Sequence, residues 1–321
     1  MQRTFKSAFL ASSAAIAIGL TACKQTNAPS PLIEAEPVAS LTVTADINAG
    51  IRTQKITIIP NDIAPWLSQI ILIDEEGELY QTALDSGEAN SLGMNAKDAI
   101  GLMRRKAPGV LLTLSETNTL SALIETSDEG DLSSITVSAP DLSLASFCQE
   151  NTAPEDNVYA LTTNGDIVNL VVLVEENESV RLSMTDRMDM AGKPIGCVKI
   201  KDQAFGLYTD RIVSSDGQQT YSMSIGEQQV AVLSGDASTR IISPLSPNPN
   251  LAIFSIGNKE AFGASVTGGL STLPLKQINA AHIYTNSMGG VFRDGALILS
   301  DATSDRIVMI SLPVVQRELT K

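Results

Sequence analysis

The chain has 321 residues, of which 43% are hydrophobic, and its formal net charge at pH 7 is −14. This acidity argues against nucleic acid as a partner, because binding it requires clustered Lys and Arg that neutralise phosphates. It also argues against a polyanionic substrate unless metal ions screen the repulsion. The hydrophobic content is sufficient for the core of one large domain or of two smaller ones.

The first 22 residues have the pattern of a secretion signal. Arg3 and Lys6 precede an apolar, alanine-rich run that extends to Leu20, and small residues then lie directly before Cys23. A signal peptide has this order of positive charge, short apolar run and small residues. The run is shorter than the roughly 20 apolar residues that a membrane span needs, so we expect a secreted protein.

The segment Leu20-Thr21-Ala22-Cys23 resembles the lipobox of bacterial lipoproteins, in which the cysteine is acylated and the chain is cut before it. The resemblance implies that Cys23 is the lipidated N-terminus, which attaches the protein to a membrane. Removal of Arg3 and Lys6 with the signal changes the formal charge from −14 to −16. Because Lys24 follows the cysteine where an aspartate would favour the inner membrane, we expect an outer-membrane lipoprotein that faces the periplasm or the cell surface. An ordinary secretory peptide with a chance cysteine is the alternative.

Two further cysteines and one histidine limit the chemistry of the mature chain. Cys148 and Cys197 either pair in an oxidising periplasm or remain buried thiols, and the sequence does not fix the geometry that a disulfide requires. The single histidine, His282, excludes a multi-histidine zinc site, and we expect it on the surface or in a loop. A serine hydrolase is not supported, because there is no Gly-x-Ser-x-Gly elbow followed by a helix.

The remaining chain is predicted as a tether followed by one β domain. Residues 23–50 are rich in proline and small polar residues and are predicted as a flexible tether. From residue 51 to 317 the chain shows short β-branched runs separated by turn signals. The clearest runs are 56–59, 70–73, 110–113, 135–137, 167–172, 230–233, 251–254 and 307–310. The turn signals include Glu76-Gly77, Glu129-Gly130, Asn164-Gly165, Asp216-Gly217 and Asp294-Gly295.

The spacing of these runs predicts an all-β fold. Helical periodicity is present at most over 96–105. Strands at a spacing of about 10–12 residues are typical of a pair of β-sandwiches or of a propeller. A propeller blade takes about 40–50 residues, so this domain has room for about six blades. The periodicity alone does not separate the two architectures.

The order of several motifs along the middle of the chain resembles the β-propeller phytases. These motifs are Phe147-Cys148, Asn157-Val158-Tyr159-Ala160-Leu161, Asn164-Gly165-Asp166, Val180-Arg181, Ile195-Gly196-Cys197-Val198 and Gly206-Leu207-Tyr208. Weaker similarities lie at 61–66, 71–80, 115–118 and 295–301. Each motif is ordinary alone, and the resemblance rests on their collinear order over residues 55–311.

The resemblance implies a six-bladed propeller built from four-stranded antiparallel blades. Members of the family are calcium-dependent 3-phytases, which hydrolyse phosphate from myo-inositol hexakisphosphate in an acidic central channel. The implied mechanism is attack by a calcium-bound water, while calcium ions and basic side chains screen the phosphate charge. On this interpretation calcium is a cofactor and an inositol phosphate is a ligand.

The chain departs from the family pattern at the positions that the chemistry needs. The replacements are Glu75 for a phosphate-binding Lys, Thr117 for an Arg, Thr163-Asn164-Gly165 for a turn with a Lys, Ile195 for a calcium-ligating Glu, Thr209-Asp210-Arg211-Ile212 for an acidic cluster, and Asn279-Ala280-Ala281-His282 for a late acidic loop. Calcium takes about six to eight oxygen ligands, and an isoleucine supplies none. Each lost charged hydrogen bond to phosphate costs about 1.5–3 kcal/mol. We therefore assign no catalytic residue.

Three aspartates remain at or beside acidic positions of the family pattern, namely Asp62, Asp210 and Asp301. They are either residual calcium ligands or solvated loop carboxylates. Two hypotheses follow for the whole chain. The first is a phytase-family phosphohydrolase that acts on inositol phosphates with calcium. The second, which the residues favour, is a pseudoenzyme that serves as a binding or scaffold module at the outer membrane for a ligand or a protein partner.

Overall fold

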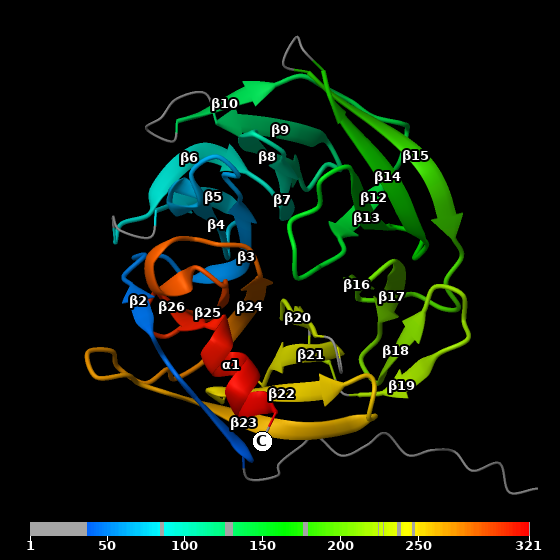
Figure 1. Ribbon diagram of the computed structural model, residues 1–321. Coiled ribbons are helices and arrows are strands. Elements are labelled where there is room, and N and C mark those ends of the chain that lie inside the picture. Colours follow the sequence, from blue (N-terminus) through cyan, green and yellow to red (C-terminus); the bar gives the residue numbers. More distant parts are fainter. Residues whose placement is uncertain are drawn as a thin grey trace, which may run out of the picture.

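The computed structural model describes residues 37–83, 87–125, 131–175, 179–223, 225–226, 228–235, 239–245 and 248–320. The predicted signal peptide, Cys23 and the first part of the predicted tether lie outside these residues. The described chain is dominated by short strands that pair into small, mostly antiparallel sheets around a common centre (Figure 1). This propeller-like arrangement confirms the all-β class and rules out the pair of sandwiches.

The strands of the described chain pair into six sheets, numbered here in chain order. Sheet 1 contains β3 (Thr53–Ile59), β4 (Gln69–Asp74), β5 (Glu78–Thr82) and β6 (Asn90–Asn95). Sheet 2 contains β7 (Asp98–Arg104), β8 (Ala107–Leu114), β9 (Leu120–Glu125) and β10 (Leu132–Ile135). Sheet 3 contains β12 (Leu144–Phe147), β13 (Asn157–Thr162), β14 (Ile167–Val174), β15 (Val180–Met188) and β11 (Val137–Ser138).

The second half of the chain forms the other three sheets. Sheet 4 contains β16 (Gly196–Ile200), β17 (Gln203–Leu207), β18 (Arg211–Ser214) and β19 (Thr220–Ser222). Sheet 5 contains β20 (Ala231–Ser234), β21 (Thr239–Pro244), β22 (Asn250–Ser255), β23 (Glu260–Thr267) and β1 (Ala39–Thr42). Sheet 6 contains β24 (Ile278–Tyr284), β25 (Ala296–Asp301), β26 (Arg306–Ser311) and β2 (Ala45–Ile47).

The innermost strands of the six sheets line the centre of the ring. β3 contacts β7, β7 contacts β12, β12 contacts β16, β16 contacts β20, β20 contacts β24, and β24 returns to β3 (Figure 1). Each of these strands carries buried side chains, and every residue of β24 is buried. The ring of inner strands positions the site described below.

Two sheets differ from the expected four-stranded antiparallel pattern, because each carries a fifth, parallel strand at its edge. β1 pairs in parallel with β23, and β11 pairs in parallel with β15. The predicted strand 135–137 is divided between two sheets. Ile135 ends β10 in sheet 2, and Val137 begins β11 in sheet 3. β1 joins its sheet from a distant part of the chain, and β11 pairs at the edge of sheet 3 opposite to its chain neighbour β12, so local patterning shows neither pairing.

The N-terminal strands complete two of the sheets and correct the predicted boundary of the tether. β1 and β2 both lie within residues 23–50, and they complete sheets 5 and 6. Leu41, Val43 and Ile47 are buried there. The prolines and small residues of this stretch concealed an alternation of buried and exposed residues that is only four residues long in β1. The β domain therefore begins near residue 38 rather than at 51.

The predicted helical stretch 96–105 is strand β7. A short apolar run such as Ala99–Met103 is compatible with a buried strand or a helix, and periodicity does not separate them. Gly101 decides the packing, because a Cβ atom there would lie 1.7 Å from the carbonyl oxygen of Ile58 in β3. Glycine thus permits the close approach of β7 to β3 in the ring.

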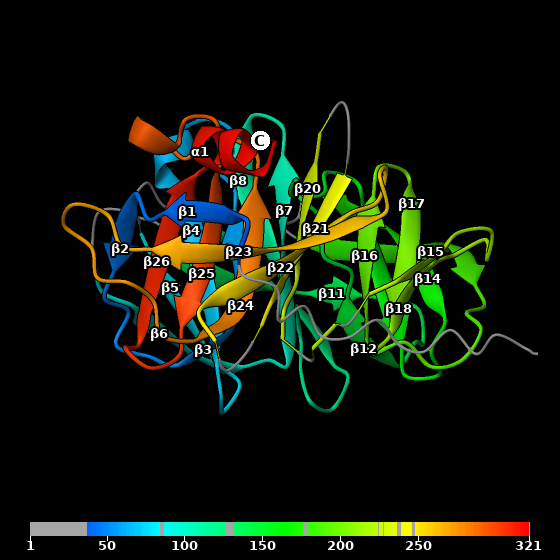
Figure 2. The same cartoon turned by 90° about the horizontal axis from the view of Figure 1, so that it is seen from below.

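Side chains from facing sheets form the core between neighbours in the ring. One cluster joins sheets 2 and 3 and includes Leu112 and Val168. Another joins sheets 5 and 6 to the helix α1 (Leu312–Leu319), which contributes Val315. α1 lies beside β1 at one rim of the ring (Figure 2). Two short 3-10 helices, η1 (Pro65–Leu67) and η2 (Gly290–Phe292), lie in loops. Within the described residues, no helix has the length and apolar character needed to span a membrane.

Candidate functional site

The centre of the ring is filled at one end by residues 148–156, which connect β12 to β13 and loop into the middle of Figure 1. The backbone of Gln149 pairs in parallel with β16 at Val198. Its N–H donates to the carbonyl oxygen of Cys197 at 3.0 Å, and its carbonyl accepts from the N–H of Lys199 at 2.8 Å. The segment therefore begins as an extra strand beside sheet 4.

The same segment is then held at the far end of the ring. The N–H of Thr285, directly after β24, donates to the carbonyl oxygen of Asn151 at 3.1 Å, and the N–H of Met103 in β7 donates to that of Pro154 at 2.8 Å. The void left between the segment, β3, β7 and β24 measures only about 10 Å³. The channel expected from the phytase resemblance is thus blocked at this end by main chain.

Two glutamine side chains bridge the ring where the filled part ends. The side-chain amide of Gln229 accepts from the N–H of Ile56 at 2.7 Å and donates to its carbonyl oxygen at 2.7 Å. The same Nε2 donates to Oε1 of Gln149 at 3.0 Å. The carbonyl oxygen of Gln229 also accepts from the N–H of Ala281 in β24 at 3.1 Å. Gln229, just before β20, therefore joins sheets 1, 5 and 6 to the segment that fills the ring.

The two cysteines whose pairing the sequence left open form a disulfide. Cys148 directly follows β12 and Cys197 lies in β16, with a Cα–Cα distance of 4.5 Å. Both residues are buried. The bond joins the inner strands of sheets 3 and 4 and anchors the start of the segment that fills the ring.

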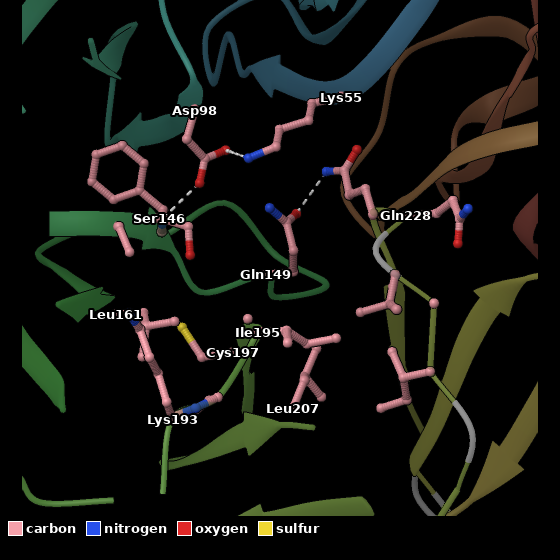
Figure 3. A pocket seen from close by; sticks show the side chains of 18 of the residues that line it. Lys55, Asp98, Ser146, Gln149, Leu161, Lys193, Ile195, Cys197, Leu207 and Gln228 are labelled. Carbon is pink, nitrogen blue, oxygen red and sulfur yellow. Dashed lines mark hydrogen bonds and ion pairs between the residues drawn. The ribbon is translucent and has the colours of Figure 1, made fainter. Parts of the chain in front are cut away.

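At the opposite end, where β3, β7, β16 and β20 begin, the ring opens into a cavity of about 520 Å³ (Figure 3). Its apolar wall includes Phe147, Leu161, Ile195, Leu207 and Val230. Its polar groups include the amides of Gln149, Gln228 and Gln229 and the charged groups of Lys55, Asp98 and Lys193. Gln149 lines both this cavity and the small void, so it lies between the open and the filled end.

The carboxylate of Asp98 is buried at the edge of this cavity and is fully engaged. Its Oδ1 lies 3.1 Å from Nζ of Lys55, and its Oδ2 accepts from the N–H of Phe147 at 2.7 Å. Only 2% of its side chain is exposed. One carboxylate thereby links the inner strands of sheets 1, 2 and 3. A charge-assisted cluster of this kind positions strands.

Lys193 supplies the exposed cation of the cavity rim. It lies in the loop between β15 and β16, and it makes no hydrogen bond or ion pair with any other residue that the structure describes. The neighbouring Ile195 is 45% exposed and faces the cavity (Figure 3). Ile195 stands where the phytase resemblance places a calcium-ligating glutamate, so the cavity wall here is apolar where that interpretation requires an acid.

The structure does not bring the three predicted calcium ligands together. Asp62, after β3, accepts from the N–H of Lys106 at 2.8 Å. Asp210 lies between β17 and β18 and pairs with Arg211 at 3.2 Å. Asp301 ends β25 in sheet 6. Among the described residues there is no group of three or more Asp, Glu, His or Cys side chains arranged to hold a metal ion.

Asp301 already has a cationic partner. The Arg306 guanidinium lies 3.3 Å from its Oδ2, and Ser304 and Thr303 donate to its two oxygens at 2.7 and 2.9 Å. Burial alone raises the pKa of Asp301, but these hydrogen bonds outweigh it and hold the pKa below the ordinary value. Arg306 also binds Asp46 of β2 at 3.2 Å. Arg306 of β26 therefore links Asp301 of β25 to Asp46 of β2 within sheet 6.

The expectation of a surface or loop position for His282 is wrong. It lies in β24 and is 9% exposed. Burial lowers its pKa to about 4, so the imidazole is neutral at physiological pH. The surrounding Asn279-Ala280-Ala281 looks like a loop because its residues are small, but small residues in an inner strand allow sheet 6 to approach the filled centre.

Sequence reasoning did not identify Lys55, Asp98, Gln149, Gln229 or Lys193 as site residues. A usable signal was the occurrence of a charged or amide side chain at or just before the start of an apolar strand, as in Asp98 before Ala99 and Gln229 before Val230. In this ring of sheets, such positions line the cavity at the open end.

Comparisons with known proteins identify no family. No family model matches the chain, and no curated protein matches it. A solved structure of BBS1N in complex with ARL6DN, soaked with lead, has 12% identity and a TM-score of 0.48, covering 86% of this chain and 97% of that chain. The crystal structure of Myxococcus xanthus glutaminyl cyclase has 10% identity and a TM-score of 0.39, with the same coverage. We draw no functional conclusion from likenesses at this level.

Proposed function

We propose that this chain is a non-catalytic β-propeller binding module whose ligand occupies the cavity at the open end of the ring. The observation that carries the proposal is the lining of the cavity. It has a mainly apolar wall and several amides, and the one carboxylate among its described lining residues, Asp98, is already engaged by Lys55 and by the Phe147 N–H. Ligand pockets of about 300–1,000 Å³ with few polar groups are typical of small-molecule sites.

The same lining argues against calcium-dependent hydrolysis. Calcium needs about six to eight oxygen ligands, whereas Ile195 replaces an expected ligand and no acidic cluster forms among the described residues. A water-filled acidic channel would also need an open centre, and residues 148–156 occupy it at the far end. A pseudoenzyme that keeps a cavity at the open end accounts for both the missing acidic cluster and the filled centre.

We also propose that the six sheets are the blades of a six-bladed propeller that diverged from the β-propeller phytases. The circle of contacts between the six innermost strands supports the blade number. The collinear motifs over 147–208 support the relationship. A lipid at Cys23 would then hold the module at the outer membrane, so that the ligand is a compound of the periplasm or the cell surface.

The cavity favours a small amphipathic anion. An apolar body can pack on Ile195, Leu207 and Phe147, which face the cavity. The free cation of Lys193 at the rim can pair with an acidic group, whereas the charge of Lys55 is largely neutralised by Asp98. A hexakisphosphate does not fit this description, because its many charges need several cations.

Phosphate release from phytate by the full chain tests the loss of catalysis. We expect no turnover with calcium, without calcium or with a chelator. A turnover that calcium restores and a chelator abolishes would contradict the pseudoenzyme proposal. A rise in melting temperature with calcium but without turnover would show binding of the ion to the folded state and would leave the non-catalytic assignment in place.

The fluorescence of 8-anilinonaphthalene-1-sulfonate, an aromatic anion, tests the cavity itself. We expect saturable enhancement by the native chain. Ile195→Trp should narrow the cavity and reduce the enhancement, and Lys193→Gln should weaken binding about threefold, as expected for an exposed ion pair. Lys276→Gln is the matched control, since Lys276 is an exposed lysine outside the cavity lining. Equal enhancement by the native and the Ile195→Trp chains would overturn the assignment.

A further inference from the structure

A second cavity of about 580 Å³ lies at the outer part of sheet 5, away from the centre of the ring. Its walls come from β21, β22, β23, the start of β1 and the C-terminal end of α1. In Figure 1 these elements lie together at the rim that carries the C-terminus. The cavity shares no lining residue with the one at the mouth of the ring.

Three polar residues cross sheet 5 in one row at this cavity. Arg240 of β21 is paired in register with Ser255 of β22, and Ser255 is paired with Glu260 of β23. Residues directly opposite in an antiparallel ladder project from the same face. Arg240, Ser255 and Glu260 all line the cavity, so this face of the row is directed into it.

Two atoms of this row have no hydrogen-bond partner. Nε of Arg240 and Oγ of Ser255 are both buried and unpaired within the described chain. Ser255 is 4% exposed and lines the cavity. Arg240 forms no ion pair with a described residue, although its guanidinium is partly buried. Buried polar groups in folded proteins are normally paired, and each unpaired one destabilises the folded state. A ligand that pairs both atoms would recover this cost.

The rest of the lining selects the class of ligand. Phe262 and Leu319 offer apolar surface beside the row. Glu260 and Glu318 also line the cavity, and Glu318 is held by Arg317 at 3.0 Å. Two carboxylates near a single arginine disfavour a phosphate, which carries more than one negative charge at neutral pH. A singly charged carboxylate matches one guanidinium, whose planar N–H groups suit its two oxygens.

We propose that Arg240 and Ser255 form a subsite for the carboxylate of a small amphipathic molecule whose apolar part packs on Phe262 and Leu319. The carboxylate accepts from Nε of Arg240 and from the Ser255 hydroxyl, the two donors that the fold leaves unpaired. This site is independent of the cavity at the mouth of the ring and does not rest on the function proposed for it.

Binding of hexanoate to the full chain tests this proposal by calorimetry and by melting temperature. We expect hexanoate to bind and to raise the melting temperature, whereas hexanamide and inorganic phosphate have little effect. Arg240→Gln should weaken hexanoate binding about tenfold or more, because a charged hydrogen bond is removed. Ser255→Ala should weaken it less and should fold normally, because it removes one unpaired hydroxyl. Arg293→Gln, at an exposed arginine elsewhere, is the control.

Each outcome separates this site from the other one. Hexanoate binding that survives Ile195→Trp but not Arg240→Gln supports the proposal. Binding that is lost in Ile195→Trp and unchanged in Arg240→Gln places hexanoate in the cavity of the ring and overturns it. The absence of hexanoate binding, or equal stabilisation by phosphate, also overturns it. If Arg240→Gln does not fold, hexanoate binding that is unchanged in Ser255→Ala is sufficient to overturn the proposal.

Discussion

The two ends of the ring differ in what occupies the space between the inner strands. At one end, main chain from residues 148–156 leaves a void of about 10 Å³, and at the other a cavity of about 520 Å³ remains. The filled end is held by backbone hydrogen bonds to β7, to β16 and to the residue after β24. The open end is held by side chains, namely the Lys55–Asp98 pair and the Gln149–Gln229 contact. In this ring, the cavity therefore remains at the end where side chains bridge the inner strands.

The largest effect should follow from removal of the ion pair at the open end. Asp98→Ala leaves Lys55 and the N–H of Phe147 without their partner, and breaking a buried pair costs about 3–5 kcal/mol. Because Lys55 is about one third exposed, we expect a value near the lower limit, about 3 kcal/mol. Urea unfolding measures the loss, with Asp210→Ala as the control, since Asp210 is an exposed aspartate in a surface ion pair. Equal losses in the two variants would show that the pair does not hold the open end.

The contrast between these cross-links also explains which parts of the fold could be predicted. The strands at 56–59, 70–73 and 307–310 were predicted correctly, because β-branched runs between turns are a local signal. The strand β7 was not, because a buried inner strand and a helix share an apolar run. β1 pairs with β23 far along the chain, β11 pairs with β15 rather than with its chain neighbour β12, and no local pattern reports such pairing.

The site residues were harder still, because their roles depend on contacts between distant positions. Gln149 and Gln229 are 80 residues apart and meet only when the segment after β12 and the residues before β20 come together in the ring. Asp98 and Lys55 look like solvated charges next to apolar runs until β3 and β7 are adjacent. The predicted ligands Asp62, Asp210 and Asp301 are acidic in sequence but lie in separate sheets or loops with local partners.

The filled end should respond to pH through His282. Its folded pKa is about 4, below the ordinary value of about 6.5. Below pH 6.5 the unfolded chain binds a proton at this residue and the folded chain does not, so stability falls as pH decreases from 6.5 to 4. The contribution present above pH 6.5 and lost near pH 4 is up to about 3 kcal/mol.

Replacement of His282 isolates this contribution. Urea unfolding of His282→Gln and of the native chain at several pH values between 4 and 7 should give a smaller pH dependence for the variant. The comparison is needed because the pKa of Glu150, in the same filled region, is raised by burial against the attraction of Lys199 and contributes in the opposite direction. Parallel pH profiles would show that His282 is not protected from protons in the folded state.

The smallest of these effects, about 2 kcal/mol, is expected where the two ends meet. Gln229→Ala removes the amide that pairs with both backbone groups of Ile56 and with Gln149. Two buried backbone groups lose partners at about 1–3 kcal/mol each, but the cavity beside them admits water that recovers part of the loss. Gln228→Ala is the matched control, because Gln228 lines the same cavity and makes none of these bonds with described residues. If the open end is held by side chains, Gln229→Ala should destabilise the fold and also alter anilinonaphthalene-sulfonate binding, whereas Gln228→Ala should affect binding alone. Equal destabilisation by the two variants would mean that the bridge across the ring is not a cross-link and that the cavity persists for another reason.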